Sequence, residues 1–78
     1  MGNVRALKRA VQLAGGQSRL AAALRDITGR PIKQAHVWNW LNRGDVLPAE
    51  MVIPIEQAVD GQVSRHELRP DIYPAEAA

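Results

Sequence analysis

The segment from Gly15 to Arg43 constrains the fold more than any other part of the chain. The Gly15-Gly16 pair at its start predicts the end of a preceding helix, because glycine adopts the left-handed conformation of a C-cap without steric cost. The run from Gln17 to about Arg25 carries apolar residues at helical spacing, and so does the run from Lys33 to Asn42. Between them, the glycine and proline of Asp26–Pro31 predict a turn. The pattern is therefore that of two helices joined across a turn.

The residues inside these two predicted helices match a helix-turn-helix unit. Leu20, Leu24 and Ile27 are expected to face inward from the first helix. Ala21 lies beside Leu20 and Leu24 on this inner side, where a small side chain lets another helix cross closely. Val37 and Trp40 form the apolar side of the second helix, which Gly44 is expected to end. The opposite, polar side is then free to enter the major groove of DNA. The predicted turn is longer than the three or four residues that are usual in this motif.

The charges of the chain divide between its two halves. From Met1 to Arg43 there are eight basic residues and one acidic residue, a net charge of +7. From Gly44 to Ala78 there are two basic and seven acidic residues, a net charge of −5. The positive half coincides with the helix-turn-helix pattern. Solvated helix faces alone can produce such a run, but the coincidence favours a nucleic-acid partner.

Length and composition favour one small cytoplasmic domain. The 78 residues leave room for a single core, and an apolar fraction of 46% is enough to build it. We expect residues 1–74 to form the domain and residues 75–78 to be a frayed tail. The lack of cysteine excludes disulfides and suits a reducing cytoplasm. No apolar run approaches membrane-spanning length.

A further helix is predicted before the motif. It runs from about Asn3, a capping residue, to Ala14. Val4, Leu7, Val11 and Ala14 lie on one side at helical spacing and predict the face that packs on the core.

Two more helices are predicted after the motif. Pro48 suits the first turn of a helix that continues to Val59, and Pro54 is expected to kink or divide it. The Ser64–Glu67 capping box predicts one more helical turn. The Ile72–Tyr73 pair is expected to fold back on the core. Since no strand pattern is present, we predict an all-α domain of four or five helices.

Five short motifs resemble a known group of bacterial proteins. They are Ala14-Gly15-Gly16-Gln17-Ser18, Val37-Trp38-Asn39-Trp40-Leu41-Asn42, Leu47-Pro48-Ala49-Glu50, Ile55-Glu56-Gln57-Ala58 and Glu67-Leu68-Arg69-Pro70-Asp71-Ile72-Tyr73. Together, over roughly Leu7 to Tyr73, they resemble the YdaS-like, Cro-like family of bacterial and prophage regulators. The resemblance implies a small lambda-repressor-like helix-turn-helix fold and transcriptional repression, often within a prophage switch or beside a toxin gene. The Arg25–Pro31 turn departs from the shorter family members by its extra residues.

Six residues of the helix from Lys33 to Asn42 are candidates for reading DNA bases. Glutamine and asparagine amides donate and accept hydrogen bonds together, which matches the N6/N7 edge of adenine. A lysine near the helix start reaches guanine or a phosphate, and an alanine contacts a thymine methyl. The alternative for each amide is a solvated helix face. The candidates are Lys33, Gln34, Ala35, Trp38, Asn39 and Asn42.

Trp38 has two interpretations. It lies about 160° from Trp40 around a helix, so it points away from the core if Trp40 is buried. An exposed indole needs a partner, which could be a sugar–phosphate edge, a base methyl or another protein surface. In the alternative, Trp38 packs against the Arg25–Pro31 turn as a second-layer core residue. The sequence leaves both open.

Five residues are candidates for contacts with the DNA backbone. Gln17, Ser18 and Arg19 open a helix whose positive N-terminal end would face a phosphate. Ser18 could equally serve only to start that helix. Arg30 and Arg43 flank the later helix and would hold phosphates at its two ends.

The other polar residues form no catalytic or metal-binding set. His36 is expected to pack near the core and His66 to be exposed, and their separation of 30 positions is no metal-ligand spacing. The serines and carboxylates form no nucleophile–base arrangement, and no glycine loop cradles a phosphate. We therefore expect neither enzyme activity nor a cofactor. The cations of the first helix, Arg5, Lys8 and Arg9, are expected to solvate it, with a contact to the DNA backbone as the alternative.

The expected function is that of a sequence-specific repressor that binds a double-stranded DNA operator as a homodimer. The apolar candidates for the dimer surface are the Met51–Val59 helix and the Ile72–Tyr73 tail.

Three alternatives use the same residues differently. In an antitoxin, the acidic Asp45–Glu76 half would bind a toxin protein, and DNA binding would serve autoregulation. In a helical interaction module, Trp38 would be a hot spot for a protein partner and no DNA would be bound. Single-stranded nucleic acid would stack on Trp38, although one aromatic is a thin platform.

Overall fold

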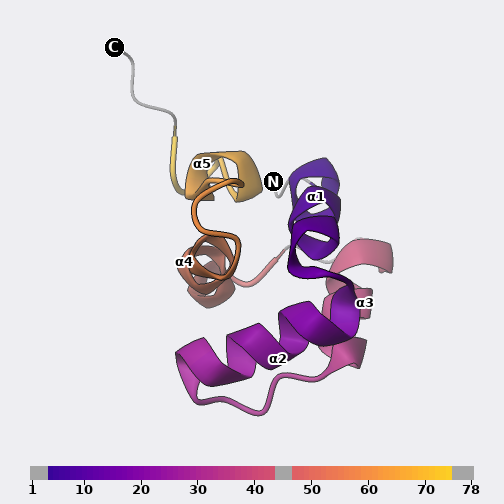
Figure 1. Ribbon diagram of the computed structural model, residues 1–78. Coiled ribbons are helices and arrows are strands. Elements are labelled where there is room, and N and C mark those ends of the chain that lie inside the picture. Colours follow the sequence, from indigo (N-terminus) through magenta and orange to yellow (C-terminus); the bar gives the residue numbers. More distant parts are fainter. Residues whose placement is uncertain (1–3, 44–46, 75–78) are drawn as a thin grey trace.

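The computed structural model describes residues 4–43 and 47–74 (Figure 1). Its helices, in chain order, are α1 (Val4–Ala14), α2 (Gln17–Thr28), α3 (Gln34–Asn42), α4 (Ala49–Ala58) and α5 (Arg65–Leu68). The described ranges contain no strand, so the predicted all-α class is confirmed. The expectations for Asn3, Gly44 and residues 75–78 concern positions outside these ranges.

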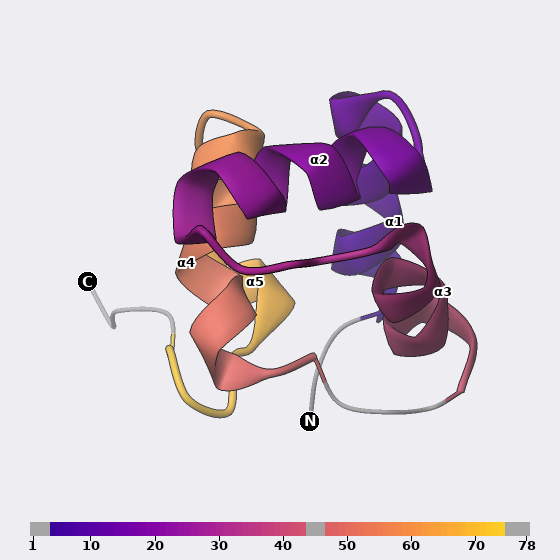
Figure 2. The same ribbon diagram turned by 90° about the horizontal axis from the view of Figure 1, so that it is seen from below.

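α2 takes part in the three most extensive helix–helix contacts of the fold, with α1, α3 and α4. Figure 2 shows α2 crossing the molecule between α1 and α4. Its inner side chains Leu20, Ala21 and Leu24 are fully buried, as predicted. Each buried leucine contributes about 1.5–3 kcal/mol of hydrophobic stabilisation. The small Ala21 side chain allows the close helix crossing that its position predicts.

α2 ends later than the sequence pattern predicts. It continues to Thr28, so the predicted Asp26–Pro31 turn is wrong in its first half. The Thr28 hydroxyl donates to the Leu24 carbonyl over 2.7 Å. Gly29 then takes a left-handed conformation with φ 71°, and its N–H donates to the Arg25 carbonyl over 2.8 Å. The glycine that indicated a turn is therefore the C-cap of a longer helix.

The chain after α2 returns along that helix to reach α3 (Figure 2). Ile32 is buried in the core on the way. The Arg25 guanidinium donates to the Ile32 carbonyl over 2.6 Å, and the Arg30 N–H donates to the Thr28 hydroxyl over 3.1 Å. These bonds attach the returning segment to the last turns of α2. As a result, α3 begins beside the start of α2 rather than beside its end.

Three apolar residues lie outside the core that the pattern predicts. Val4, Ile27 and Ile72 are exposed, whereas Tyr73 packs on the core as expected. Val4 is the first residue of α1, Ile27 lies in the last turn of α2, and Ile72 follows α5. Residues at the ends of elements have few neighbouring elements to cover them, which explains their exposure.

α4 is continuous through Pro54, so the expected division of the helix there is wrong. Pro54 lies in the interior of α4 and removes one backbone bond, to the carbonyl four residues earlier, and burial of Val52 and Ile55 offsets that loss. Pro48 occupies the N-cap, one position before the first turn. The most apolar side of α4 faces the core through Met51, Val52 and Ile55, so these residues are not available to a second copy of the chain.

α5 begins at the capping box that the sequence predicts. The Ser64 N–H donates to a Glu67 carboxylate oxygen over 2.9 Å, and the Glu67 N–H donates to the Ser64 hydroxyl over 3.2 Å. The box supplies side-chain acceptors to two backbone N–H groups at the start of the helix. The capping-box prediction is confirmed.

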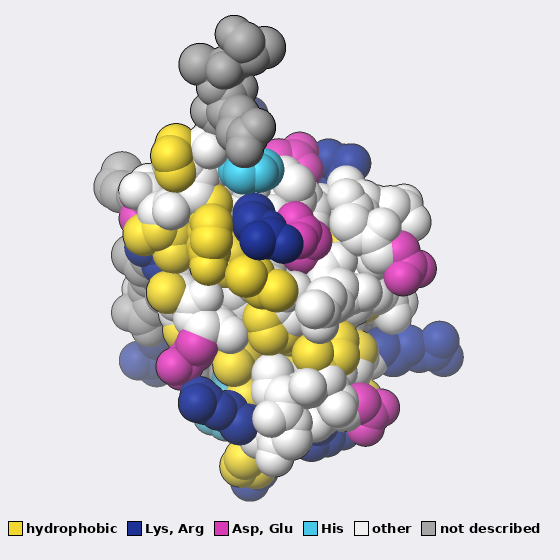
Figure 3. All heavy atoms as spheres, turned by 90° about the vertical axis from the view of Figure 1, so that its left-hand side faces the viewer, with side chains coloured by type: hydrophobic (Ala, Val, Ile, Leu, Met, Phe, Trp, Pro, Cys, Tyr) yellow, Lys and Arg dark blue, Asp and Glu magenta, His cyan; other side chains and the backbone are white. Residues whose placement is uncertain are grey.

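Within residues 4–43 and 47–74, four ion pairs join arginines to carboxylates of the acidic half. They are Arg9–Glu67 at 3.3 Å, Arg30–Glu50 at 3.0 Å, Arg65–Glu56 at 2.8 Å and Arg69–Asp71 at 2.6 Å. Figure 3 shows basic and acidic side chains in contact within a band of hydrophobic side chains on the α4 side of the molecule. Much of the negative charge of this half is therefore neutralised within the chain.

Candidate nucleic-acid interface

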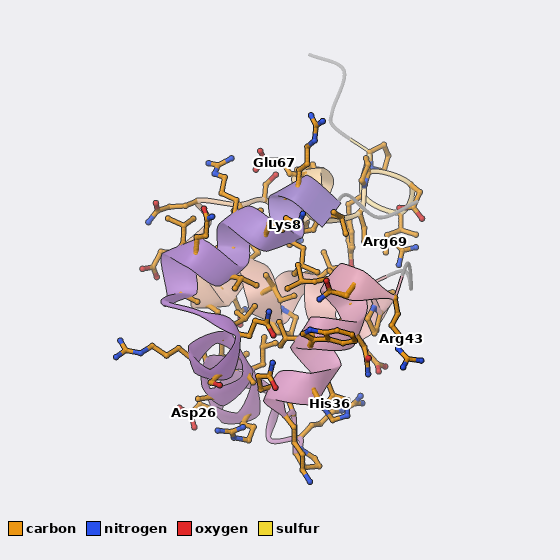
Figure 4. The ribbon with its side chains drawn as sticks, turned by 90° about the vertical axis from the view of Figure 1, so that its right-hand side faces the viewer. Lys8, Asp26, His36, Arg43, Glu67 and Arg69 are labelled. Carbon is orange, nitrogen blue, oxygen red and sulfur yellow. The ribbon has the colours of Figure 1, made fainter. Side chains whose placement is uncertain are left out.

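The outer side of α3 is a polar surface that contains one aromatic side chain. Val37 and Trp40 are buried, as predicted, and the residues opposite them therefore face outward. Figure 4 views this side of the molecule, where α3 lies beside α1 and α2. Asn39 is half-buried. The exposed candidates are Lys33, Gln34, Ala35, Trp38 and Asn42.

The first residue of α3 is bonded to the first residue of α2. The Gln34 side-chain N–H donates to the Gln17 side-chain oxygen over 2.6 Å. Gln17 is half-buried and Gln34 is exposed. The bond uses one N–H of the Gln34 amide and leaves its second N–H and its oxygen for an outside partner. The contact thus fixes the direction in which Gln34 presents a donor and an acceptor.

The two tryptophans of α3 differ in their surroundings. Trp40 is 8% exposed and belongs to the core, whereas Trp38 is 44% exposed. The interpretation of Trp38 as a second-layer core residue is therefore wrong, because nearly half of the residue's surface is exposed to solvent. One turn later, the Asn42 side-chain N–H donates to the Trp38 carbonyl over 2.9 Å. This bond holds the Asn42 amide along the same side of the helix.

Both histidines occupy positions that differ from the expected ones. His36 is exposed rather than packed near the core, because it is the third residue of α3 and turns back toward the helix start. Its Nδ1 accepts the Lys33 N–H over 2.9 Å, and its own N–H donates to the Lys33 carbonyl over 3.0 Å. His66 is half-buried, with its Nδ1 2.9 Å from the Tyr73 carbonyl oxygen. Each ring thus serves a local hydrogen bond.

The backbone-contact candidates lie at the start of α2 and at the end of α3. Ser18, Arg19 and Arg43 are exposed, and Figure 4 shows Arg43 pointing away from the protein. The N-cap of α2 is Gly16, and no side chain caps that end of the helix. Ser18 therefore does not perform the helix-starting role that its residue type allowed.

Arg30 differs from the other candidate cations because it already has a partner. Its guanidinium lies 3.0 Å from the Glu50 carboxylate, and both side chains are more than half exposed. An exposed pair of this kind is worth about 0–1 kcal/mol. Arg30 can therefore exchange Glu50 for another anion at little cost. Within residues 4–43 and 47–74, Arg19, Lys33 and Arg43 form no ion pair.

The family model described as bacterial toxin YdaS matches residues 7–77 of the chain. The chain belongs to the YdaS family. A solved structure is also similar to this YdaS-family chain, namely the Cro protein from the prophage element Xfaso 1 of Xylella fastidiosa strain Ann-1. The two chains share 38% sequence identity, the match covers 90% of this chain and 97% of that one, and the TM-score is 0.76. No curated protein matches the sequence.

The fold of this YdaS-family chain is thus that of a Cro-like helix-turn-helix protein, in which α2 and α3 form the motif. The resemblance noted in the sequence is confirmed. Family and fold are those of Cro-like regulators. Across the part of the chain that the structure describes, every helix is too short or too polar to cross a membrane.

A groove beside α3 is a feature of this YdaS-family chain that the sequence pattern did not reveal. Its volume is about 270 Å³. Gln17 and Asn42, which are candidate DNA contacts, line it together with residues of α1, among which only Lys8 had a DNA contact as an alternative to solvation. The complete lining is Lys8, Val11, Gln12, Gln17, Leu41 and Asn42. The spacing of Lys8 and Gln12 places them on one side of α1, but that spacing alone does not tell which helix that side meets.

Proposed function

We propose that this chain is a sequence-specific repressor that binds double-stranded DNA and inserts the outer side of α3 into the major groove. One observation carries the proposal: the exposed amides of α3 begin with Gln34, which Gln17 holds in a fixed orientation. Such amides discriminate bases because they donate and accept on the same base edge. Lys33, Ala35, Trp38, Asn39 and Asn42 complete the proposed base contacts.

The distribution of ion pairs supports this orientation on DNA. Among the described residues, the carboxylates of α4 and α5, and Asp71 after α5, are paired with arginines. Arg19, Lys33 and Arg43 have no such partner within the described ranges. Since a duplex carries its negative charge along the backbone, it is attracted to the α2–α3 side. Gln17, Ser18, Arg19, Arg30 and Arg43 are the proposed phosphate contacts.

We propose a homodimer as the DNA-bound form. The nine residues of α3 cover few base pairs, whereas two copies on half-sites about 34 Å apart read twice as many. The α4 side suits the contact between copies, because its charges are paired and a hydrophobic band crosses it (Figure 3). The α2–α3 side, with its unpaired cations, would repel a second copy. A single chain bound to a duplex with two half-sites, as measured by sedimentation equilibrium, would contradict the dimer.

The family description names a bacterial toxin, which supports a second candidate, a toxin-linked role with a protein partner. In an antitoxin, the acidic half would provide the contact. Glu56, Glu67 and Asp71 of that half pair with arginines of the same chain, which leaves less negative charge for a partner. Isolation of the chain from its host in a stoichiometric complex with a toxin, free of DNA, would favour this candidate.

The experiment that tests the proposed function is selection of bound sequences from random duplex DNA, followed by titration of the selected duplex at several salt concentrations. We expect one enriched sequence with related half-sites about one helical turn apart. We also expect a salt slope that corresponds to roughly five or more released counterions per dimer. No enrichment, together with no binding at low salt, would rule the function out.

A further inference from the structure

We propose that the groove between α1 and α3 seats one phosphodiester of the DNA backbone together with its deoxyribose, with Lys8 and Gln12 as direct contacts. This site rests on the proposed DNA-binding function. It extends that function to α1, for whose cations the sequence pattern favoured solvation over a DNA contact and identified no site.

The chemistry of the groove fits an anion with an apolar neighbour. Lys8 supplies a positive charge, and the side chains of Gln12, Gln17 and Asn42 carry amide N–H groups. No carboxylate lines the groove, so an anion meets no repulsion there. Val11 and Leu41 provide apolar surface on which the carbon-bound hydrogens of a sugar can rest.

The size of the groove also fits this ligand. Its volume of about 270 Å³ is several times the ~30 Å³ that one water molecule occupies in the liquid. A single monatomic ion would leave most of that space to water. A phosphate with its sugar would displace that water and contact polar and apolar walls together.

The position of the groove links it to the base-reading side. Gln17 and Asn42 line the groove, and Gln17 also bonds Gln34 at the start of α3. Figure 4 shows Lys8 on α1 and Arg43 at the end of α3 on the same side of the molecule. A duplex that receives the outer side of α3 in its major groove would therefore carry one backbone strand along α1.

Lys8 and Arg9 are neighbours with different surroundings, which provides a matched control. Among the described residues, no ion pair or side-chain hydrogen bond engages Lys8. Arg9 instead contacts Glu67 at 3.3 Å and donates to the Gln62 carbonyl over 2.9 Å, away from the groove. Loss of one charge at either position changes the net charge equally. Only loss at position 8 removes the proposed phosphate contact.

The test compares the full chain with Lys8→Gln, Gln12→Ala and Arg9→Gln on a duplex selected from random DNA. Thermal unfolding first confirms that each variant is folded under the binding conditions. We expect Lys8→Gln to weaken binding roughly five- to tenfold and to lower the salt slope by about 1. Gln12→Ala should weaken binding without changing the slope, because it removes no charge. Arg9→Gln should leave the slope unchanged.

A second readout locates the phosphate itself. Duplexes that each carry one neutral methylphosphonate linkage are titrated with the wild-type chain and with Lys8→Gln. At the linkage that occupies the groove, the neutral group should weaken wild-type binding and have little further effect on Lys8→Gln. The site would be overturned, with DNA binding left intact, if Lys8→Gln and Arg9→Gln weakened binding equally. It would also be overturned if no methylphosphonate linkage weakened wild-type binding more than binding of Lys8→Gln. Absence of wild-type binding to any duplex would instead overturn the function on which the site rests.

Discussion

Gln34, the first residue of α3, donates its side-chain amide to Gln17, the first residue of α2, across 2.6 Å. The two residues are 17 positions apart and meet because the segment after Gly29 returns along α2. Both helix starts are thereby brought to one side of the molecule. The hydrogen bond between the two side chains would thus link the proposed phosphate contact of Gln17 to the proposed base contact of Gln34.

Loss of either glutamine should therefore have the same effect on DNA binding. We expect Gln17→Ala and Gln34→Ala each to weaken binding to the selected duplex by about 1–2 kcal/mol. The double variant should lose little more than either single variant, because the two side chains act as a unit. Fluorescence anisotropy titrations of the four proteins measure this. Additive losses would show that the contact has no role in binding.

Asn39 is the half-buried amide among the proposed base contacts, and its replacement tests sequence discrimination. We expect Asn39→Ala to weaken binding to the selected duplex by about 1–3 kcal/mol and to leave binding to unrelated duplex nearly unchanged. The reason is that base contacts carry selectivity, whereas phosphate contacts do not. Competition titrations with both duplexes separate the two. Equal weakening on both would mean that Asn39 reads no base.

The two tryptophans should respond in opposite ways to replacement by alanine. Trp40→Ala should lower the free energy of unfolding by about 3–5 kcal/mol, since Trp40 is buried in the core. Trp38→Ala should change the free energy of unfolding by less than about 1 kcal/mol and weaken DNA binding by about 1–2 kcal/mol. Urea unfolding and DNA titration of each variant measure both effects. A strongly destabilised Trp38→Ala chain would contradict the outward position of this indole.

Gly16 joins α1 to α2 in a backbone conformation that glycine adopts and other residues avoid. Its φ is 122° and its ψ is 171°, and a methyl group added there would meet no atom within 4 Å. We therefore expect Gly16→Ala to lower the free energy of unfolding by about 1–3 kcal/mol through the backbone alone. Thermal unfolding measures the change. An unchanged midpoint would show that this junction tolerates a side chain.

The lowered pKa values of three carboxyls in the acidic half predict that the protein loses stability in acid. Hydrogen bonds from Arg65 lower the pKa of Glu56, the backbone N–H of Ser64 lowers that of Glu67, and the Arg69 guanidinium lowers that of Asp71. Each carboxyl has a lower pKa in the folded protein than in the unfolded chain, so its ionised form stabilises the fold above the unfolded pKa near 4. This stabilisation is lost as the pH falls through the pKa of the folded state.

The measurement is urea unfolding at several pH values between about 7 and 3. We expect the free energy of unfolding to be constant near neutrality and to fall below about pH 5. Glu56→Gln should cost about 1–2 kcal/mol at pH 7 and should make the loss in acid smaller, because one titrating group is gone. Equal stability at pH 3 and pH 7 would contradict the assignment.

Local signals in the sequence predicted the helices and which side of α3 faces outward. The apolar positions Val37 and Trp40 define the inner side of α3, and Ser64 with Glu67 defines the start of α5. The last turn of α2 was missed because Gly29 indicates both a turn and a helix cap. Interpreting Gly29 as a helix C-cap places the end of the helix at Thr28, and this interpretation would have predicted the last turn of α2.

Contacts between distant residues could not be read from periodicity. The Gln17–Gln34 bond depends on the return of the chain along α2, and the groove at Lys8 depends on which side of α1 meets α3. The pairing of Arg30 with Glu50 likewise joins segments whose distance is set by the whole fold. These three features arise from tertiary packing, for which the spacing of residue types carries no signal.

The most direct test of the central claim is an NMR titration of the labelled full chain with the selected duplex, with side-chain amide and indole N–H signals followed. We predict large shifts for the amides of Gln34, Asn39 and Asn42 and for the Trp38 indole, with the buried Trp40 indole and α5 nearly unaffected. Shifts confined to α4 and α5, with the α3 amides unmoved, would contradict DNA reading by the outer side of α3.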